Sequence, residues 1–379
     1  MLEVEHIDGM GRVDAAAWDA LVGPDDPFTE HAFLRTLEDS GSVGPGTGWT
    51  PRHVLVRRDG RLVGATPAYV KDHSYGEYIF DWGWAEAAHR AGLRYYPKVV
   101  CAVPHTPAGG SRLLLAPGVG PELVDALHGG LQALADAARA SSLHVLFSTE
   151  AERDALVARG MLPRLTYQFH WEDRGFGDFE GFLGAMRSPA RKQVRRERRE
   201  AAAHGLRIEA LRGDALTPAA WDAARRFYRA TAARKGAYPY LTDAFFELAA
   251  TTLRHRALIF LALRGHQPVA GTLSFQKGRH LYGRYWGCVD AFELLHFEVC
   301  YYAPIELCLR EGWTRFEAGA QGEHKLKRGF LPSPTFSAHW IRHPALARAV
   351  GEWLPHEAAA VEQEMRILAE EGPYRRDGC

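Results

Sequence analysis

The chain contains one local pattern twice, and this repeat limits the folds that the sequence can adopt. In the first half VRRDGRLVGATPAYV is followed by SYGEYIFDWGW; in the second half LALRGHQPVAGTLSFQ is followed by LYGRYWGCV. Each copy reads as an apolar strand, a tight turn, a returning strand and an aromatic segment. Two copies of one unit explain this better than two unrelated domains, so the sequence predicts a tandem α/β fold.

Length and charge agree with this prediction and limit the kinds of partner that the protein can bind. The 379 residues exceed what one core usually supports, and two domains of about 150 to 200 residues each fit. The 46 Lys and Arg residues balance the 46 Asp and Glu residues. No global field therefore attracts nucleic acid or a membrane surface, and we expect no DNA partner; polyanion binding needs a local patch.

The cysteines and the N-terminus indicate a cytoplasmic protein. The five cysteines are odd in number and form no C-x-x-C pair, which argues against a disulfide framework and a zinc cluster. The 18 histidines include no H-E-x-x-H pair, so we expect no structural metal. The first residues are acidic where a signal peptide is basic, and no apolar run is long enough to span a bilayer.

Periodicity and breakers predict the following helices and strands. In the first half they are a strand over 2–7, a helix over 14–22, a helix over 29–40 capped by Thr29, a hairpin of strands 53–57 and 62–70 around Asp59-Gly60, an aromatic strand over 74–84, a helix over 85–91, a strand over 99–103, a helix over 122–139 and a strand over 143–147. In the second half they are helices over 221–234 and 242–253, strands over 257–263 and 268–275, and a long final helix over 344–371.

The segment 186–203, MRSPARKQVRRERREAAA, predicts a basic helix between the halves. Ser188 is suited to cap it, with Pro189 at its first position. Lys192, Arg195, Arg196 and Arg199 are spaced i, i+3, i+4 and i+7, which places them in one stripe suited to polyanion binding. The alternative is a solvated helix in which Glu197 and Glu200 pair internally. Because the helix is polar nearly all round, we expect domains at 1–185 and 205–379 with residues 186–204 connecting them.

The repeat and several longer phrases resemble a known family. A hairpin, an aromatic strand, a helix and another strand resemble the core of the GNAT acyltransferase fold, here in tandem. The phrases SYGEYIFDW, GLRYYPK, LYGRYWGC, HFEVCYY and FEAGAQGEHKLKRG are similar to a FemAB-like family of N-acyltransferases related to peptidoglycan biosynthesis. The resemblance covers about residues 27–339. It implies two GNAT-like domains and transfer of an aminoacyl group from aminoacyl-tRNA to an amine, on a peptidoglycan precursor or a small metabolite.

The donor remains open between aminoacyl-tRNA and acyl-CoA. GNAT enzymes bind coenzyme A with an R/Q-x-x-G-x-G/A loop, but here CVDAFELLHFEV follows Gly287. This weakens the coenzyme A alternative, although backbone amides can bind pyrophosphate without that motif. A non-catalytic tandem module that binds a cell-wall precursor is the alternative of another class. In either enzyme the donor is a co-substrate, and no tightly bound cofactor is expected.

Acyl transfer to an amine needs a base for the amine proton and donors for the developing oxyanion. The candidate bases in the second half are His296, Glu298, Glu317, Glu323 and His324. Of these we favour His324 and Glu298, because burial within LLHFEVCYY would raise the pKa of a carboxyl; the alternative is a Glu298 held by a neighbouring Arg or Tyr. The family resemblance implies that Lys325, or else Lys327, lies near the reacting centre.

Further residues are candidates for binding substrate. The glycine-containing turn after 316 offers Gln321 as a donor, and Arg112 follows a loop with too many breakers to form an element. Aromatic residues of the two copies are more often core than binding wall, but Arg284 needs an anionic partner. The substrate-binding candidates are Asp81, Trp82, Arg112, Arg284, Tyr285, Trp286, His296, Tyr301, Glu317 and Gln321. The cysteines in apolar surroundings are expected to be inert, which excludes covalent catalysis by a thiol.

Overall fold

The computed structural model describes residues 1–118, 120–320 and 322–375. Its contacts divide the chain into two compact units: unit 1 is Met1–Tyr167 with Pro334–Glu364, and unit 2 is Gln168–Ser333 with Met365–Cys379. This division differs from the expected 1–185, 186–204 and 205–379, because the basic helix belongs to unit 2 and residues 334–364 return to unit 1. The return has a packing cause: Ile341, Val350 and Leu354 share a core with Trp84 and Ala88.

Unit 1 contains two groups of paired strands. One has the order β1 (Leu2–Ile7), β3 (His53–Arg58), β4 (Arg61–Thr66) and β7 (Leu114–Leu115), all antiparallel. The other has the order β15 (Leu331–Ile341), β8 (Ser142–Ser148), β6 (Lys98–Cys101), β5 (Ala68–Lys71) and β2 (Trp49–Pro51), with β6 and β8 parallel. Its helices are α1 (Ala15–Asp19), α2 (His31–Asp39), α3 (Trp82–Arg90), α4 (Glu122–Ala137) and α5 (Glu150–Val157).

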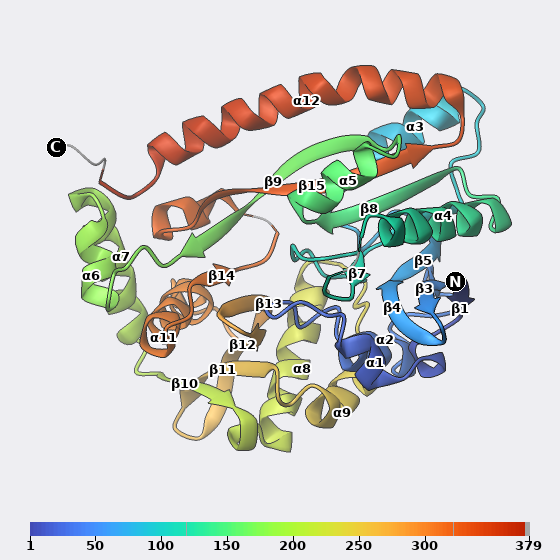
Figure 1. Ribbon diagram of the computed structural model, residues 1–379. Helices are drawn as coiled ribbons and strands as arrows, with labels where there is room; N and C mark the ends of the chain where they lie inside the picture. The colour runs from blue at the N-terminus through green and yellow to red at the C-terminus, as the bar shows by residue number, and fades with distance from the viewer. Residues whose placement is uncertain (119, 321, 376–379) are drawn as a thin grey trace. The chain divides into compact units, whose positions relative to one another are not determined.

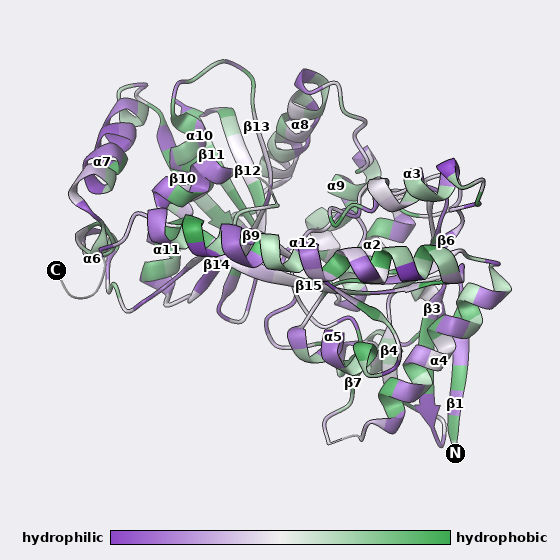
Figure 2. Ribbon diagram, turned by 90° about the horizontal axis from the view of Figure 1, so that it is seen from above, coloured by the Kyte–Doolittle hydropathy of each residue, from purple (hydrophilic) through white to green (hydrophobic). Residues whose placement is uncertain are grey.

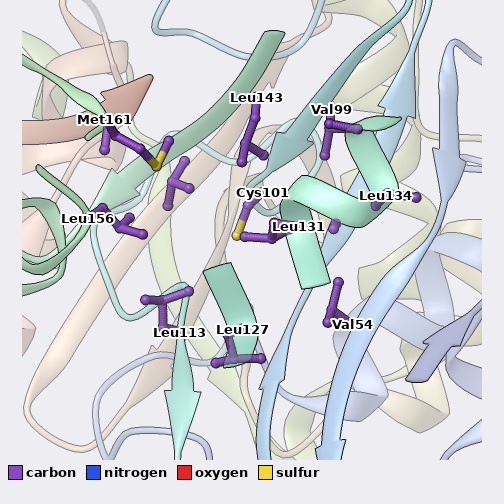
Figure 3. Close-up of a cluster of buried hydrophobic side chains, with 14 of the residues drawn as sticks. Val54, Val99, Cys101, Leu113, Leu127, Leu131, Leu134, Leu143, Leu156 and Met161 are labelled. Carbon is purple, nitrogen blue, oxygen red and sulfur yellow. The ribbon is translucent and has the colours of Figure 1, made fainter. Parts of the chain in front are cut away.

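Helix α4 supplies one wall of the core of unit 1. Leu127, Leu131 and Leu134 point from it toward Val54 of β3 and Val99 of β6 (Figure 3). All five side chains are buried, which confirms the amphipathic helix expected over 122–139. Each buried aliphatic side chain contributes about 1.5 to 3 kcal/mol relative to exposure.

The first hairpin has the expected turn. Asp59 and Gly60 both have positive φ, 51° and 78°, as a two-residue turn of this kind requires, and β3 pairs with β4 around them. The expected cap of the second helix was wrong. Glu30, not Thr29, precedes α2 and its side chain does not cap the helix; the amide of His31, the first helical residue, donates instead to Asp19 Oδ1 at 2.7 Å.

The prediction of an aromatic strand over 74–84 was wrong. Residues 72–81 form a loop, and α3 begins at Trp82. Three polar residues of this loop, Ser74, Glu77 and Asp81, are buried and face Lys98, whereas the aromatic Tyr75 is 68% exposed. A strand would alternate its side chains between two faces and could not bring these three groups to one ammonium.

Unit 2 has its own set of strands, in the order β10 (Arg207–Arg212), β11 (Ala257–Arg264), β12 (Gln267–Lys277), β13 (His280–Cys288), β14 (Arg315–Glu317) and β9 (Leu162–Glu172) (Figure 1). Its helices are α6 (Phe179–Ala185), α7 (Ser188–Ala202), α8 (Pro218–Arg234), α9 (Asp243–Thr252), α10 (Leu295–Phe297) and α11 (Ala303–Glu311). Strands β9 and β15 and the long helix α12 (Pro344–Glu371) run from one unit into the other.

The second hairpin, β11 and β12, and the strands and helices expected around it are confirmed. Helix α8 packs so closely on β13 that a Cβ at Gly287 would clash with the Phe227 carbonyl oxygen, so this position accepts glycine alone. Helix α7 is largely hydrophilic (Figure 2). Its expected cap was wrong by one position, because Ser188 is the first helical residue and Arg187 precedes it.

No helix within the described residues combines the length and the apolar character that a bilayer crossing requires.

Candidate active site

The site begins where β13 and β14 stop pairing. The two strands are parallel, and their register joins His280–Tyr282 with Arg315–Glu317. On its other edge β13 has a bulge, since Leu273 pairs with Tyr285 but Ser274 pairs with Gly283, which leaves Arg284 as the extra residue. Bulges of this kind redirect a side chain and are frequent beside functional sites. The segments that follow β13 and β14 are therefore not paired with each other, and each forms one wall of the candidate site.

The wall after β13 is an irregular helix. It starts after Leu294, whose φ is 61°, and runs through α10 into a π-helical turn, η3 (Glu298–Tyr302), before α11. A π turn inserts one residue into a helix and is often found at functional sites. Here it separates two side chains that the sequence placed close together: Glu298 faces α7, and Tyr301 faces the turn after β14.

The wall after β14 is a turn built on glycines. Gly319 and Gly322 have φ of 80° and 113°, which other residues rarely adopt, and they lead into the 3-10 turn η4 (Glu323–Arg328). Gln321, a predicted substrate-binding residue, lies outside the described residues. The turn carries His324 on its partly solvated side and Lys325 on its buried side.

His324 lies in an aromatic cluster with residues of the first wall. Its Nε2 forms a hydrogen bond of 2.9 Å with the Tyr301 hydroxyl, and its ring lies 6.1 Å from His296 and 5.8 Å from Phe297. Trp286 closes the cluster, 5.2 Å from His296. Burial, followed by the charges of neighbouring Arg and Lys residues, lowers the pKa of His324, and burial lowers the pKa of His296 to about 4. Both rings are therefore neutral at neutral pH.

Lys325 is the most unusual charge of the site. Its side chain is 1% exposed, and its Nζ donates to the Gly319 carbonyl at 2.6 Å. Among the described residues no carboxylate lies within ion-pair distance of it. Burial therefore lowers the pKa of Lys325 from 10.5 to about 7. An ammonium poised to lose or keep its proton near neutral pH suits charge stabilisation at a reacting centre.

Glu298 has a different environment. Both of its oxygens accept from Arg198, at 3.1 and 2.9 Å, and Arg198 also donates to Glu306. Burial raises the pKa of Glu298, and the Arg198 guanidinium opposes that rise. It lines a surface pocket of about 390 Å³ together with Arg195 and Arg198. The structure thus shows the arrangement that the sequence left as the alternative, a carboxylate held by an arginine.

Glu317 ends β14 as a buried carboxylate. Its Oε1 lies 3.2 Å from Arg315 Nε, and its Oε2 lies 3.8 Å from His170 Nε2. Burial and the Arg315 charge lower the pKa of His170 well below its usual value, so the ring is neutral. These contacts connect the Glu317 carboxylate to β14 and β9, so it helps to hold the two strands together where the glycine turn begins.

The remaining predicted substrate-binding residues of unit 2 lie on β13. The guanidinium of Arg284 lies 5.3 Å from the centre of the Tyr285 ring, and that ring lies 5.2 Å from Tyr228 of α8. Trp286 accepts a hydrogen bond from Thr231 through its carbonyl oxygen. Arg284, Tyr285 and Trp286 are half-buried, so part of each residue is packed and part remains accessible to solvent.

Three predicted substrate-binding residues belong to unit 1. Asp81 is buried and accepts from Lys98, Tyr95 and Ser74. Trp82 is 41% exposed and stacks on a neighbouring ring. The prediction that Arg112 is free to line a site was wrong: it is 1% exposed and donates to the carbonyls of Leu146 and Ala108, and its backbone amide is held by Glu152.

The predicted basic stripe on α7 is solvent-exposed. Lys192, Arg195, Arg196 and Arg199 all lie on its outer side, where Arg195 pairs with Glu180 and Arg196 with Glu200. The inner side of α7 carries a buried carboxylate that the sequence did not reveal. Glu197 is buried and binds Arg328 of η4, a contact between residues 131 apart that helical spacing alone could not predict.

Burial keeps two of the cysteines protonated. Burial raises the pKa of the Cys300 and Cys308 thiols well above the usual value, so neither is a thiolate. No group of three or more His, Cys, Asp or Glu residues is arranged to hold a metal ion among the residues described.

Comparison with known proteins identifies the family and supports the fold. The FemAB-like family model, described as peptidoglycan biosynthesis/recognition, matches residues 9–376. A search of curated proteins found no significant match. Among solved structures, the chain is similar to FemX, with a TM-score of 0.55 and 14% identity over 92% of this chain and 100% of that chain.

Two further structures are similar. A C-terminal domain from Agrobacterium fabrum, whose name refers to lysylphosphatidylglycerol synthetase, has a TM-score of 0.55 and 10% identity over 92% of this chain and 97% of that one. A tandem GNAT protein from the clavulanic acid pathway has a TM-score of 0.44 and 15% identity over 91% and 99%. The expected fold class, mixed α/β with two tandem GNAT-like domains, is confirmed. The chain belongs to the FemAB-like family.

Proposed function

We propose that this protein is an N-acyltransferase that moves an aminoacyl group from aminoacyl-tRNA to an amine of a peptidoglycan precursor. The observation that carries the proposal is Lys325, a buried ammonium without a carboxylate partner among the described residues, next in sequence to a histidine held by Tyr301. Family membership supplies the class of reaction, and the structural likeness to FemX and the tandem fold agree with it.

In the proposed reaction the neutral acceptor amine attacks the carbonyl carbon of the aminoacyl ester. A C–N bond forms and the carbonyl oxygen becomes an oxyanion; the oxyanion then collapses to a carbonyl, the C–O bond to the ribose breaks, and the ribose oxygen leaves as a hydroxyl with the proton that His324 has taken from the amine. His324 takes the proton from the attacking nitrogen. Lys325, in its charged form, donates to the oxyanion, which is the larger electrostatic contribution in reactions of this kind. No acyl group becomes attached to the protein.

His324 suits the role of base better than Glu298. Its Nε2 is held by Tyr301, and among the described residues no hydrogen bond occupies its Nδ1, which can accept the amine proton. Burial raises the pKa of the Tyr301 hydroxyl, so Tyr301 stays neutral and fixes the orientation of the ring. Both oxygens of Glu298 are already engaged by Arg198.

Several features favour aminoacyl-tRNA over acyl-CoA as donor. The helix after β13 begins at Leu295 and is not preceded by the glycines of a pyrophosphate loop. The exposed stripe of Lys192, Arg195, Arg196 and Arg199 offers contacts to tRNA phosphates. This donor and a precursor made inside the cell would place the reaction in the cytoplasm. Acyl-CoA remains the second donor to be tested.

A transfer assay tests the proposal. Labelled aminoacyl-tRNA and labelled acyl-CoA are offered separately, each with peptidoglycan precursors, and acylated product is measured. We expect product from aminoacyl-tRNA, and a fall in kcat of about 10²-fold or more in His324→Ala. Product from acyl-CoA alone would overturn the donor. Precursor binding without turnover with either donor would instead support a non-catalytic binding module.

A further inference from the structure

Glu197 is the one residue of the basic stretch RRERRE that turns fully inward. It lies on α7 between the exposed Arg196 and the half-buried Arg198, and it is 2% exposed. A buried carboxylate is costly unless hydrogen bonds compensate its charge, and Glu197 has several. Its two oxygens accept from Arg328 at 3.0 and 2.8 Å, and further bonds come from the hydroxyl of Tyr302 and from Gln193.

Arg328 connects Glu197 to the proposed catalytic turn. It is the last residue of η4, and its Nη1 donates to the His324 carbonyl at 2.5 Å. Its guanidinium also covers the ring of Phe297, 3.3 Å from the ring centre, and Phe297 belongs to the aromatic cluster around His324. One planar fork therefore fixes the backbone that carries His324 and the ring beside it, and Glu197 fixes the fork.

We propose that Glu197 and Arg328 are positioning residues, which hold the turn bearing His324 and Lys325 in its productive geometry from helix α7. This rests on the proposed function, in which His324 and Lys325 perform the transfer. Neither Glu197 nor Arg328 touches the reacting atoms. Their effect is geometric: a displacement of about 1 Å in catalytic groups can cost about 10²-fold in rate. Helix α7 thus has a role in catalysis that is separate from its exposed basic stripe.

A paired substitution separates positioning from folding. Glu197→Gln alone leaves a buried arginine without its partner and destabilises the protein. Glu197→Leu combined with Arg328→Met removes both charges, and replacement of a buried ion pair by apolar groups of similar volume is often neutral for stability. We expect this double variant to melt near the wild-type temperature, to keep the KM for the acceptor, and to lose about 10²-fold in kcat.

A second readout does not depend on turnover. The nitrogen chemical shift of His324 Nε2, assigned with His324→Ala, reports the hydrogen bond between His324 and Tyr301, two residues that the double variant retains. We expect this shift to change in the double variant. Arg328→Lys keeps the charge but not the two-pronged geometry, and we expect an intermediate loss of kcat; it carries the test if the double variant does not fold.

The matched control is Arg229→Gln, which removes an exposed ion pair between Arg229 of α8 and Asp243 of α9, residues that take no part in this network. We expect wild-type kcat and an unchanged His324 signal. A folded double variant, or a folded Arg328→Lys, with wild-type kcat and an unchanged His324 Nε2 shift would overturn the inference. If the wild type transfers nothing, the proposed function fails; the shift then decides the positioning role by itself, and an unchanged shift overturns it.

Discussion

Lys98 of unit 1 and Lys325 of unit 2 are both buried lysines, and their surroundings are opposite. Lys98 Nζ donates to Ser74 at 2.7 Å, to Glu77 at 2.8 Å and to Asp81 at 2.5 Å, so each of its three N–H groups has an acceptor and two of the acceptors are carboxylates. Lys325 Nζ donates to one backbone carbonyl. The charge of Lys98 is balanced by its carboxylate partners, whereas Lys325 can offer its charge and its remaining N–H groups to a substrate.

This difference separates a structural role from a chemical one. The Lys98 ammonium joins the inward-facing polar residues of the loop 72–81 to β6, which explains why the aromatic phrase SYGEYIFDW is not a strand. Among the described residues Lys325 Nζ bonds the Gly319 carbonyl alone, and the glycine turn around it is closed also by its own backbone and by Arg328. Burial of a charge is thus insufficient to indicate a catalytic group; burial without a counter-charge is the better sign.

The largest expected effect is on the stability of unit 1. Lys98→Met leaves Asp81 buried without its lysine partner and leaves Glu77 with Lys71, 3.8 Å away, and we expect a loss of about 3 to 5 kcal/mol in the unfolding free energy of that unit. Denaturant unfolding followed by signals from unit 1 measures it. A loss below about 1 kcal/mol would show that Lys98 is not the structural member of the comparison.

Lys325→Met is expected to lower activity without lowering stability. Removal of one donor to an oxyanion costs about 10² to 10³ in kcat, while the melting temperature at neutral pH should not fall, because the substitution also removes the cost of burying an ammonium. Lys327→Met, on the exposed side of the same turn, should keep most activity. Equal losses in both variants would remove the distinction between a buried and an exposed lysine.

The pH dependence of stability sharpens the comparison. The folded-state pKa of Lys325, about 7, lies below its usual 10.5, so the unfolded chain binds more protons between these values and stability rises with pH. We expect this residue to contribute about 2 kcal/mol between about pH 7 and about pH 9. The wild type should gain that amount over Lys325→Met, and parallel pH profiles of the two proteins would contradict it.

The smallest expected effect concerns Glu298, a carboxylate that is partnered as Lys98 is. Because Arg198 holds both of its oxygens, Glu298→Gln should change kcat less than about tenfold and lower the unfolding free energy by about 1 kcal/mol. The transfer assay and denaturant unfolding measure the two quantities. A fall in kcat as large as that of His324→Ala would return the role of base to Glu298.

The sequence predicted what local patterns determine. Both hairpins follow from turn residues and apolar alternation, and α4 and α8 follow from helical spacing. The apparent repeat failed at SYGEYIFDW, because its likeness to LYGRYWGC is one of composition. The first phrase places Ser74, Glu77 and Asp81 against Lys98, whereas the second forms β13. Charges that are distant in sequence decided which of the two became a strand.

The candidate site was predictable as a region but not as a geometry. The phrases HFEVCYY and EAGAQGEHK do approach each other, through Tyr301 and His324. The π turn that directs Glu298 away from His324 has no sequence signal, and neither has the contact between Glu197 and Arg328. Both depend on tertiary packing, which overrides the spacing of residues along the chain.

The titration of Lys325 tests the central claim most directly. Protein labelled with carbon-13 at the lysine Cε positions is titrated by NMR, and Lys325→Met assigns the signal. We predict a transition of the Lys325 signal near pH 7, where the charged and the neutral form of the lysine are both populated. A Lys325 signal that titrates near its usual pKa of 10.5 would show an ammonium stabilised as an ordinary charge, and would contradict the account.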